Sequence, residues 1–277
     1  MTIAAIFSVR PRGLRFGLSS GLPSDLQEAA AGAPRSTLGR RTARAWAASG
    51  AAAWLCIGMV APASAAPLDS MIRGVKFDSA STVREYLSEG VDPNSVDNYG
   101  YPLLAIAARE KSDQAAEVLA SAPHIDLGKT DKAGENALML AAINKDDAMV
   151  KMLIAKGAEV NKSGWAPLHY AASVGATNIV QMLLDASAYV DAGSPNGTTP
   201  LMMAARGGFM STIKLLTDAG ADVTLKNQLG MTAADFAQHY HETEAAKSLQ
   251  AAIDARKAMP PAAGSNDTPQ PVITPLR

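Results

Sequence analysis

Cysteine is almost absent from this chain, because Cys56 is the only one among its 277 residues. One cysteine cannot form a disulfide within the chain or supply the paired thiolates of a structural zinc site. Cys56 lies inside an apolar run near the N-terminus, and Trp54 stands nearby where a lipoprotein motif needs a small residue. The sequence therefore argues against a disulfide scaffold, a cysteine-based metal site and thiol catalysis.

Aromatic residues are also scarce, at 5% of the chain, whereas alanine is abundant. This composition is typical of thin helices that pack closely through small side chains. Charge is unevenly divided: the first 65 residues carry seven basic and two acidic side chains, and the rest carry 18 basic and 24 acidic ones. A region with a net charge of −6 is poorly suited to nucleic acid, whose binding depends on neutralising phosphates.

A repeat dominates the remaining sequence. Gly100, Gly134, Gly164, Gly197 and Gly230 each precede a short apolar or alanine-rich stretch, at intervals of 34, 30, 33 and 33 residues. A fixed period in this range indicates one supersecondary unit copied along the chain.

Each copy contains the signals of two short helices. Pro167 and Pro200 suit the first turn of a helix, where a missing N–H is not needed. Gly175 and Gly208 suit the end of that helix, because glycine tolerates the left-handed conformation. The segment 179–184, Ile-Val-Gln-Met-Leu-Leu, has the spacing of one buried face of a second helix.

These residues resemble the ankyrin repeat, whose signature is Gly-x-Thr-Pro-Leu-His-x-Ala-Ala. The copy at 164–172 carries the histidine, His169, but has Ala166 at the threonine position, and the copy at 197–205 carries Thr199 but has Met202 in place of the histidine. The resemblance implies an all-α solenoid of stacked helix-turn-helix units with hairpin-loop fingers. Outer copies are expected to be atypical because one of their faces meets water.

The expected ankyrin-repeat domain covers residues 66–257 and contains six units. They are a capping unit at about 68–96 and repeats at about 97–130, 131–163, 164–193, 194–226 and 227–257. The 30-residue interval is three residues short, and the shortage falls at 159–163, where a finger should be. We therefore expect a truncated finger and a notch in the row.

Residues 1–65 read as an N-terminal extension followed by a secretory signal peptide. Four arginines precede an uncharged run, 45–60 is its apolar part, and the exit Ala63-Ser64-Ala65 predicts cleavage after Ala65. The alternative is an uncleaved membrane anchor at residues 45–61. The expected location is thus the periplasm or the exterior, with no stable membrane insertion after cleavage. Residues 258–277 are rich in proline and predict a disordered tail.

The sequence offers no persuasive catalytic, cofactor-binding or metal-binding pattern. Gly128-Lys129-Thr130 resembles the end of a phosphate-binding loop, but Pro123 replaces the required glycine. His239 and His241 lie two residues apart on an expected helix and so point in different directions. The resemblance assigns His169 a structural role, in which the imidazole hydrogen-bonds backbone in neighbouring turns. The methionines of the second helices read as core residues rather than as a soft-metal site.

Without such a pattern, the candidate functional site is a binding surface, and solenoids usually bind through their concave face. Exposed aromatic and arginine side chains dominate binding energy at interfaces, which draws attention to Tyr99, Tyr101 and Trp165. Trp165 equally suits a role in covering the gap beside the shortened finger. The candidate partner-binding residues are Tyr99, Tyr101, Arg109, Lys132, Glu135, Trp165, Ser173, Val174, Asn196, Thr198, Arg206, Gln228 and Leu229.

The first hypothesis is an exported, monomeric, non-catalytic protein that binds another protein through its concave face. Resemblance to signal-bearing bacterial ankyrin proteins adds an association of some relatives with oxidative-stress defence and catalase. Two alternatives stay open. One is a secreted effector acting on host proteins, and the other is a small-ligand carrier or enzyme with a site in the notch near Trp165 and Lys162.

Overall fold

The computed structural model describes residues 65–258. The predicted signal peptide, the alternative anchor at 45–61 and Cys56 lie outside the described residues, as does the proline-rich tail from 259 onwards. Helix α2 begins at Ala65, the residue after which cleavage is predicted. None of the helices within 65–258 is long and apolar enough to cross a membrane.

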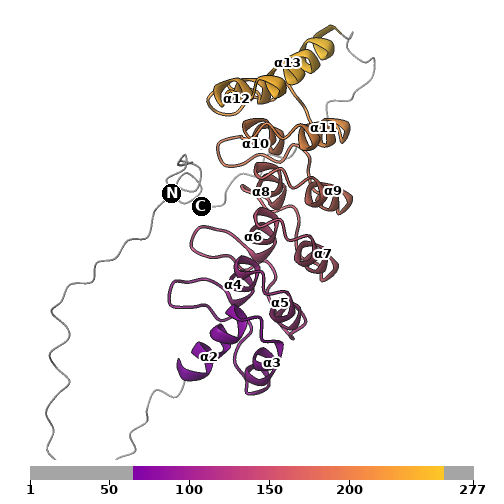
Figure 1. The fold of residues 1–277 in the computed structure, drawn as a ribbon. Helices are drawn as coiled ribbons and strands as arrows, with labels where there is room; N and C mark the ends of the chain where they lie inside the picture. Colours follow the sequence, from indigo (N-terminus) through magenta and orange to yellow (C-terminus); the bar gives the residue numbers. More distant parts are fainter. Residues whose placement is uncertain (1–64, 259–277) are drawn as a thin grey trace, which may run out of the picture. The chain divides into compact units, whose positions relative to one another are not determined.

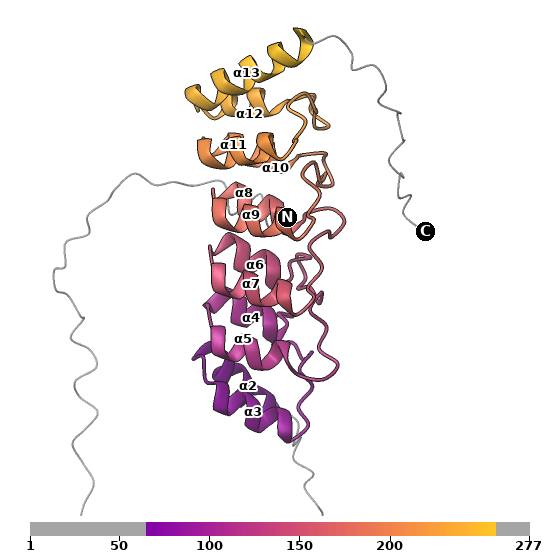
Figure 2. The same ribbon diagram turned by 90° about the vertical axis from the view of Figure 1, so that its right-hand side faces the viewer.

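The described part is all-α and contains twelve helices arranged as six consecutive pairs, so the predicted fold class is confirmed. Inner helices α2, α4, α6, α8, α10 and α12 contact one another in sequence order, and most outer helices do the same beside them (Figures 1 and 2). Each of the six predicted units contains one pair. The helices are α2 (Ala65–Lys76), α3 (Ala80–Ser88), α4 (Leu103–Glu110), α5 (Asp113–Ala120), α6 (Ala137–Ile143), α7 (Asp147–Ala155), α8 (Pro167–Ser173), α9 (Thr177–Asp185), α10 (Pro200–Arg206), α11 (Met210–Asp218), α12 (Ala233–His239) and α13 (Thr243–Ala258).

Several inner helices begin with a residue whose side chain accepts a hydrogen bond from a backbone N–H of the first turn, or with a proline, which has no N–H to satisfy. Pro167 and Pro200 open α8 and α10, as their sequence predicts. Asn136 accepts a hydrogen bond from the backbone N–H of Met139 at 3.0 Å and so caps α6. Such short helices gain most of their stability from packing rather than from intrinsic propensity.

The core between the two helical layers is built from small and aliphatic side chains. Alanines of α4, α6, α8, α10 and α12 are almost fully buried, and a buried leucine fills the equivalent position in four consecutive inner helices, as Leu104, Leu138, Leu168 and Leu201. Of the methionines in the second helices, Met149 is buried as predicted, whereas Met152 and Met182 are only half-buried. Because alanine side chains are small, successive helices can approach closely. Each unit also needs its neighbours to bury its apolar face.

Loops that precede α4 and α6 extend away from the helices as fingers (Figure 1). One polar side chain organises each complete finger by accepting hydrogen bonds from the backbone N–H groups two or four residues later. Asp97 accepts from Tyr99 and Tyr101 at 2.9 Å, and Asp131 accepts from Ala133 and Glu135 at 2.8 and 3.0 Å. The side chains of Ser194 and Asn227 hold the two later fingers in the same way.

The finger before α8 is the exception. Asn161 stands three residues before Gly164, where Asp97 stands relative to Gly100, but its side chain bonds elsewhere. Its amide donates to the carbonyl of Ser187 at 2.8 Å and accepts from the N–H of Tyr189 at 2.8 Å. Asn94, six residues before Gly100, makes the corresponding two bonds to the next unit. The missing three residues are therefore those of the finger itself, and the predicted truncation is present.

Candidate functional site

Four of the predicted binding residues gather around the first two fingers and α4. The guanidinium of Arg109, at the end of α4, lies 4.3 Å from the ring centroid of Tyr101, which precedes the same helix. Tyr99, at the tip of that finger, is 74% exposed. The stem of Lys132 lies against Gly100, because a Cβ added there would be 2.8 Å from the lysine Cε. We call Tyr99, Tyr101, Arg109 and Lys132 the tyrosine–arginine cluster.

Two predicted binding residues are buried, which corrects the expectation that their side chains meet a partner. Glu135 is 8% exposed and accepts a hydrogen bond of 3.0 Å from the hydroxyl of Tyr170. Thr198 is 3% exposed, and its carbonyl lies 3.0 Å from Nε2 of His169. Both positions follow the tip of a finger, and residues of α8 contact them from a neighbouring unit.

Burial sets the protonation of these groups. Loss of solvation raises the pKa of Glu135, while the hydrogen bond from Tyr170 opposes that shift. Burial likewise lowers the pKa of His169 to about 4, so its ring is neutral at pH 7. Nδ1 accepts from the N–H of Ala166 at 3.1 Å, which leaves Nε2 to donate to the carbonyl of Thr198. His169 is thus a structural residue, as the resemblance implies.

Neighbouring residues of α8 attach the shortened unit to both of its neighbours. Tyr170 reaches the finger at 131–135, which belongs to the preceding unit, and His169 reaches the finger at 194–198 of the following unit. Trp165 is half-buried and packs edge-on against His169, with ring centroids 5.3 Å apart. The tryptophan therefore covers the histidine and keeps part of its ring at the surface.

The C-terminal half carries a second arginine–aromatic pair. The guanidinium of Arg206, at the end of α10, lies 4.8 Å from the ring centroid of Tyr240, which follows α12. Gln228 ties the last two fingers together, because its backbone N–H donates to the carbonyl of Asn196 at 2.9 Å and its amide donates to Pro195 at 3.0 Å. Leu229, at the last finger tip, is 79% exposed.

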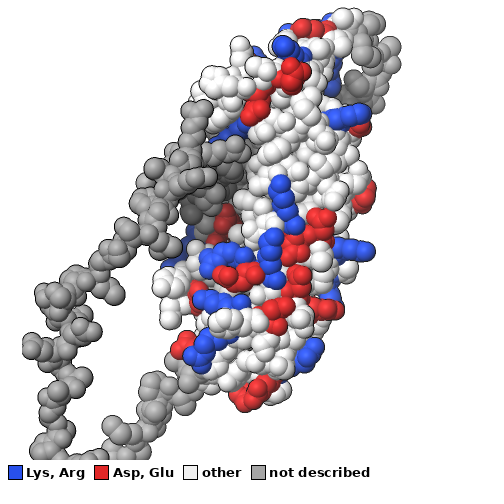
Figure 3. All heavy atoms as spheres, in the orientation of Figure 1, with Lys and Arg blue, Asp and Glu red and all other residues white. Residues whose placement is uncertain are grey.

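Charge is distributed unevenly over the face seen in Figure 3. Basic and acidic side chains alternate over the units containing α3 to α7, whereas the surface where α8 and α10 end is mostly uncharged. The predicted residues Ser173 and Val174 lie at this uncharged end of α8, and Phe209 and Met210 stand at the equivalent turn of the next unit.

The exposed aromatic or apolar residues that the sequence analysis missed include Phe77, Tyr189, Met210 and Tyr240. Phe77, Met210 and Tyr240 lie at or beside the turns between the two helices of a pair, and Tyr189 lies in the loop after α9. The sequence could have revealed these residues, because they are large and apolar in predicted turns, where small or polar residues are usual.

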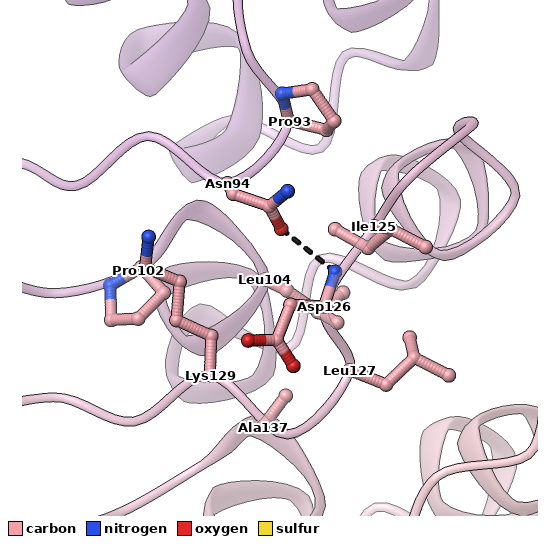
Figure 4. A pocket seen from close by; sticks show the side chains of 9 residues that line it. All are labelled: Pro93, Asn94, Pro102, Leu104, Ile125, Asp126, Leu127, Lys129 and Ala137. Atoms are coloured by element: carbon pink, nitrogen blue, oxygen red, sulfur yellow. Dashed lines mark hydrogen bonds between the residues drawn. The ribbon is translucent and has the colours of Figure 1, made fainter.

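The loops of the first units enclose a small hollow, shown in Figure 4. Asn94 closes it by accepting a hydrogen bond from the N–H of Asp126 at 2.8 Å, and the space is too tight for a water molecule. An open groove on the outer side, between α7 and α9, is lined by Ile154 and Met182 with Lys151 and Asp185. Neither includes Trp165 or Lys162, the residues of the ligand-carrier hypothesis.

Two further observations concern the phosphate-loop and metal-site readings of the sequence. The N–H of Gly128 donates to Asp126 at 2.9 Å inside a turn, and no helix follows directly, so the phosphate-loop resemblance has no structural counterpart. Within residues 65–258, no three histidine, cysteine, aspartate or glutamate residues converge to hold a metal ion.

Comparison with known families supports the repeat assignment. A model of three ankyrin-repeat copies matches residues 71–163 and 104–194, and a single ankyrin-repeat model matches 196–228. Together these matches span more than half of the chain.

Curated proteins with similar sequences include two from Mus musculus. The nuclear factor NF-kappa-B p105 subunit is 34% identical over 119 residues, which are 40% of this chain and 12% of that protein. The B-cell lymphoma 3 protein homolog is 28% identical over 124 residues, 42% of this chain and 28% of that protein. The matched region thus spans less than a third of either relative.

The ankyrin repeat domain of Bcl-3, described as a unique member of the IkappaB protein family, is a similar solved structure. It has a TM-score of 0.57 and 25% sequence identity, over 64% of this chain and 81% of that one.

Proposed function

The chain belongs to the ankyrin-repeat family, and we propose that it is a non-catalytic module that binds another protein through its fingers and inner helices. Ankyrin repeats typically serve protein–protein interaction, which supports this class of function. The observation that carries the proposal is the row of exposed and half-buried aromatic and arginine side chains along this face, above all Arg109 over Tyr101.

Residue chemistry favours this face over the outer helices. Tyrosine, tryptophan and arginine contribute most to binding at interfaces, since each combines a large contact area with a hydrogen-bonding group. Arg109 and Arg206 are each held over a tyrosine ring, at 4.3 and 4.8 Å. Side chains that are held in place before binding lose less conformational entropy when a partner docks.

We further propose export to the periplasm, supported by the arginine-rich start, the apolar run and the Ala-Ser-Ala exit at 63–65. We extend this proposal to a role in oxidative-stress defence, which is what the resemblance of the sequence to exported bacterial ankyrin proteins implies. Fractionation of cells producing the full chain with a C-terminal tag tests the location. A tagged species shortened by about 65 residues in the periplasmic fraction is expected, and a full-length cytoplasmic species would contradict export.

Site-specific photo-crosslinking in those cells tests the binding face. A photoreactive phenylalanine analogue replaces Val174 or Leu229 on the proposed face, or Lys151 on the outer face as a matched control. We expect a discrete adduct from positions 174 and 229 and none of that mass from position 151. The proposal fails if position 151 alone is crosslinked or if all three positions form the same adducts.

A further inference from the structure

The tyrosine–arginine cluster presents hydrogen-bond donors that the protein itself does not satisfy. The only carboxylate within ion-pair distance of Arg109 in the described part is that of Glu110, whose Oε1 lies 3.7 Å from Nε. That separation is too long for a hydrogen bond, and both side chains are about 40% exposed. The two terminal nitrogens of the guanidinium therefore remain available for a planar, bidentate acceptor.

Lys132 adds a second cation beside the same tyrosines. Its stem runs over Gly100, which stands between Tyr99 and Tyr101 in the chain. The lysine is exposed, and no carboxylate within residues 65–258 lies within 4.0 Å of its ammonium group. Because the aliphatic part of the Lys132 side chain lies along the finger that contains Gly100, its ammonium group stays near the cluster.

Apart from the exposed Glu110, the carboxylates near the cluster make contacts within the protein. Oδ1 of Asp97 and Oδ1 of Asp131 each accept two backbone hydrogen bonds inside their own fingers. Glu135 is buried against Tyr170. Residues 65–258 carry 17 basic and 23 acidic side chains, so the two cations and two tyrosines of the cluster form a locally basic, aromatic site on a net-acidic domain.

We propose that the cluster binds a short, extended, acidic segment of the partner protein. Carboxylates of the segment pair with Arg109 and Lys132, and its apolar atoms contact the rings of Tyr99 and Tyr101. The inference rests on the proposed function and names the chemistry of the partner. A nucleic acid would offer phosphate to the same cations, but its backbone would bring a long row of negative charges to a net-acidic domain, whereas a peptide with two carboxylates meets two cations.

Displayed libraries of nine-residue peptides test the proposal with the full-length protein. Three libraries differ only in two fixed positions, which are Glu, Gln or Lys. Peptides from the Glu library are expected to bind at least tenfold more tightly than those from the Gln library, and the Lys library should yield no binders. Fluorescence anisotropy of selected peptides gives the dissociation constants, and raising the salt concentration should weaken binding.

Charge reversal supplies the decisive comparison. In the variant Arg109→Glu/Lys132→Glu, binding of Glu peptides should be lost and peptides from the Lys library should now bind. The matched control is Arg84→Glu/Lys151→Glu, which reverses one arginine and one lysine that are exposed on the outer helices. It should keep the wild-type preference, and circular dichroism checks that both variants remain helical.

The proposal is overturned if no library shows a charge preference or if the cluster variant binds Glu peptides as well as wild type does. It is also overturned if a nine-nucleotide single strand binds more tightly than the Glu peptides. These failures leave the proposed function standing when crosslinking at Val174 and Leu229 still captures a face-specific partner. If crosslinking fails as well, both ideas fall.

Discussion

The hydroxyl of Tyr170 donates a hydrogen bond of 3.0 Å to the carboxylate of Glu135, 35 residues earlier in the chain. It joins α8 to the finger of the preceding unit, next to the place where the finger of its own unit is shortened. Both side chains are buried, so the bond is made in surroundings where an unpaired carboxylate is costly.

Replacing Tyr170 by phenylalanine should therefore destabilise the fold by about 1–3 kcal/mol, because the buried carboxylate loses its donor. Urea unfolding of the full chain measures the change. The double variant Tyr170→Phe/Glu135→Met should recover most of the loss, since neither polar group then remains. A Tyr170→Phe variant as stable as wild type would show that Glu135 does not depend on this bond.

The cost of Tyr170→Phe should also depend on pH. Burial raises the pKa of Glu135 above its usual 4.5, and the hydrogen bond from Tyr170 counteracts that rise. Without the bond, the folded state takes up a proton more readily than the unfolded state at pH values just above 4.5. The destabilisation should accordingly shrink as the pH falls toward that value. A cost that grows on acidification would contradict the argument.

Protonation of His169 should weaken the fold in acid. Burial lowers its pKa from 6.5 to about 4, so the neutral ring stabilises the folded state fully above pH 6.5, and that contribution is lost as the pH falls toward 4. A shift of this size corresponds to at most about 3 kcal/mol. Urea unfolding between pH 7.5 and pH 4 should show a shallower pH dependence for His169→Gln than for wild type. Parallel profiles would rule out this role for the ring.

A serine occupies a backbone conformation that favours glycine at the end of α9. Ser187 has φ of 65°, whereas Gly157 holds the equivalent place after α7 with φ of 91°. Ser187→Gly should raise the free energy of unfolding by about 1 kcal/mol by relieving this strain. Gly157→Ser should lower it by a similar amount, because nothing lies within 4 Å of an added Cβ and only the backbone is affected. Changes of the same sign in the two variants would refute the strain argument.

Gly175 has a second constraint besides its φ of 65°. A Cβ at this position would lie 2.5 Å from the ring of Phe209, which packs over the turn between α8 and α9. Gly175→Ala should cost clearly more than the roughly 1 kcal/mol expected from backbone strain alone. Gly220→Ala is the matched control, since its φ is 95° and the space around an added Cβ is open. Phe209→Ala should reduce the cost of Gly175→Ala, and strict additivity of the two changes would contradict the predicted contact.

The repeat itself was predictable from the sequence, because a glycine period near 33 residues reflects the length of one unit and depends on little beyond that unit. Pro167 and Pro200 likewise predicted the starts of two helices, and α8 and α10 begin at these residues. The three-residue shortage at 159–163 placed the truncated finger correctly. Each of these features is local, and each depends on the hydrogen bonds and steric limits of a few consecutive residues.

The orientation of individual side chains was harder to predict from the sequence. Glu135 and Thr198 follow finger tips just as Tyr101 does, yet both are buried. Contacts across units decide this, since Tyr170 draws Glu135 inward and His169 takes the carbonyl of Thr198. Partners that lie about 30 residues away leave no signal in the local sequence pattern.

The amino-acid sequence by itself determined a solenoid of paired helices with one defective finger, because periodicity and turn residues act within a unit. Only the tertiary structure decided that Arg109 stacks on Tyr101, that Lys132 lies along Gly100, and that the shortened unit is held by side chains of α8. Such contacts depend on how one unit is rotated and spaced against the next, which is set by packing of the whole stack.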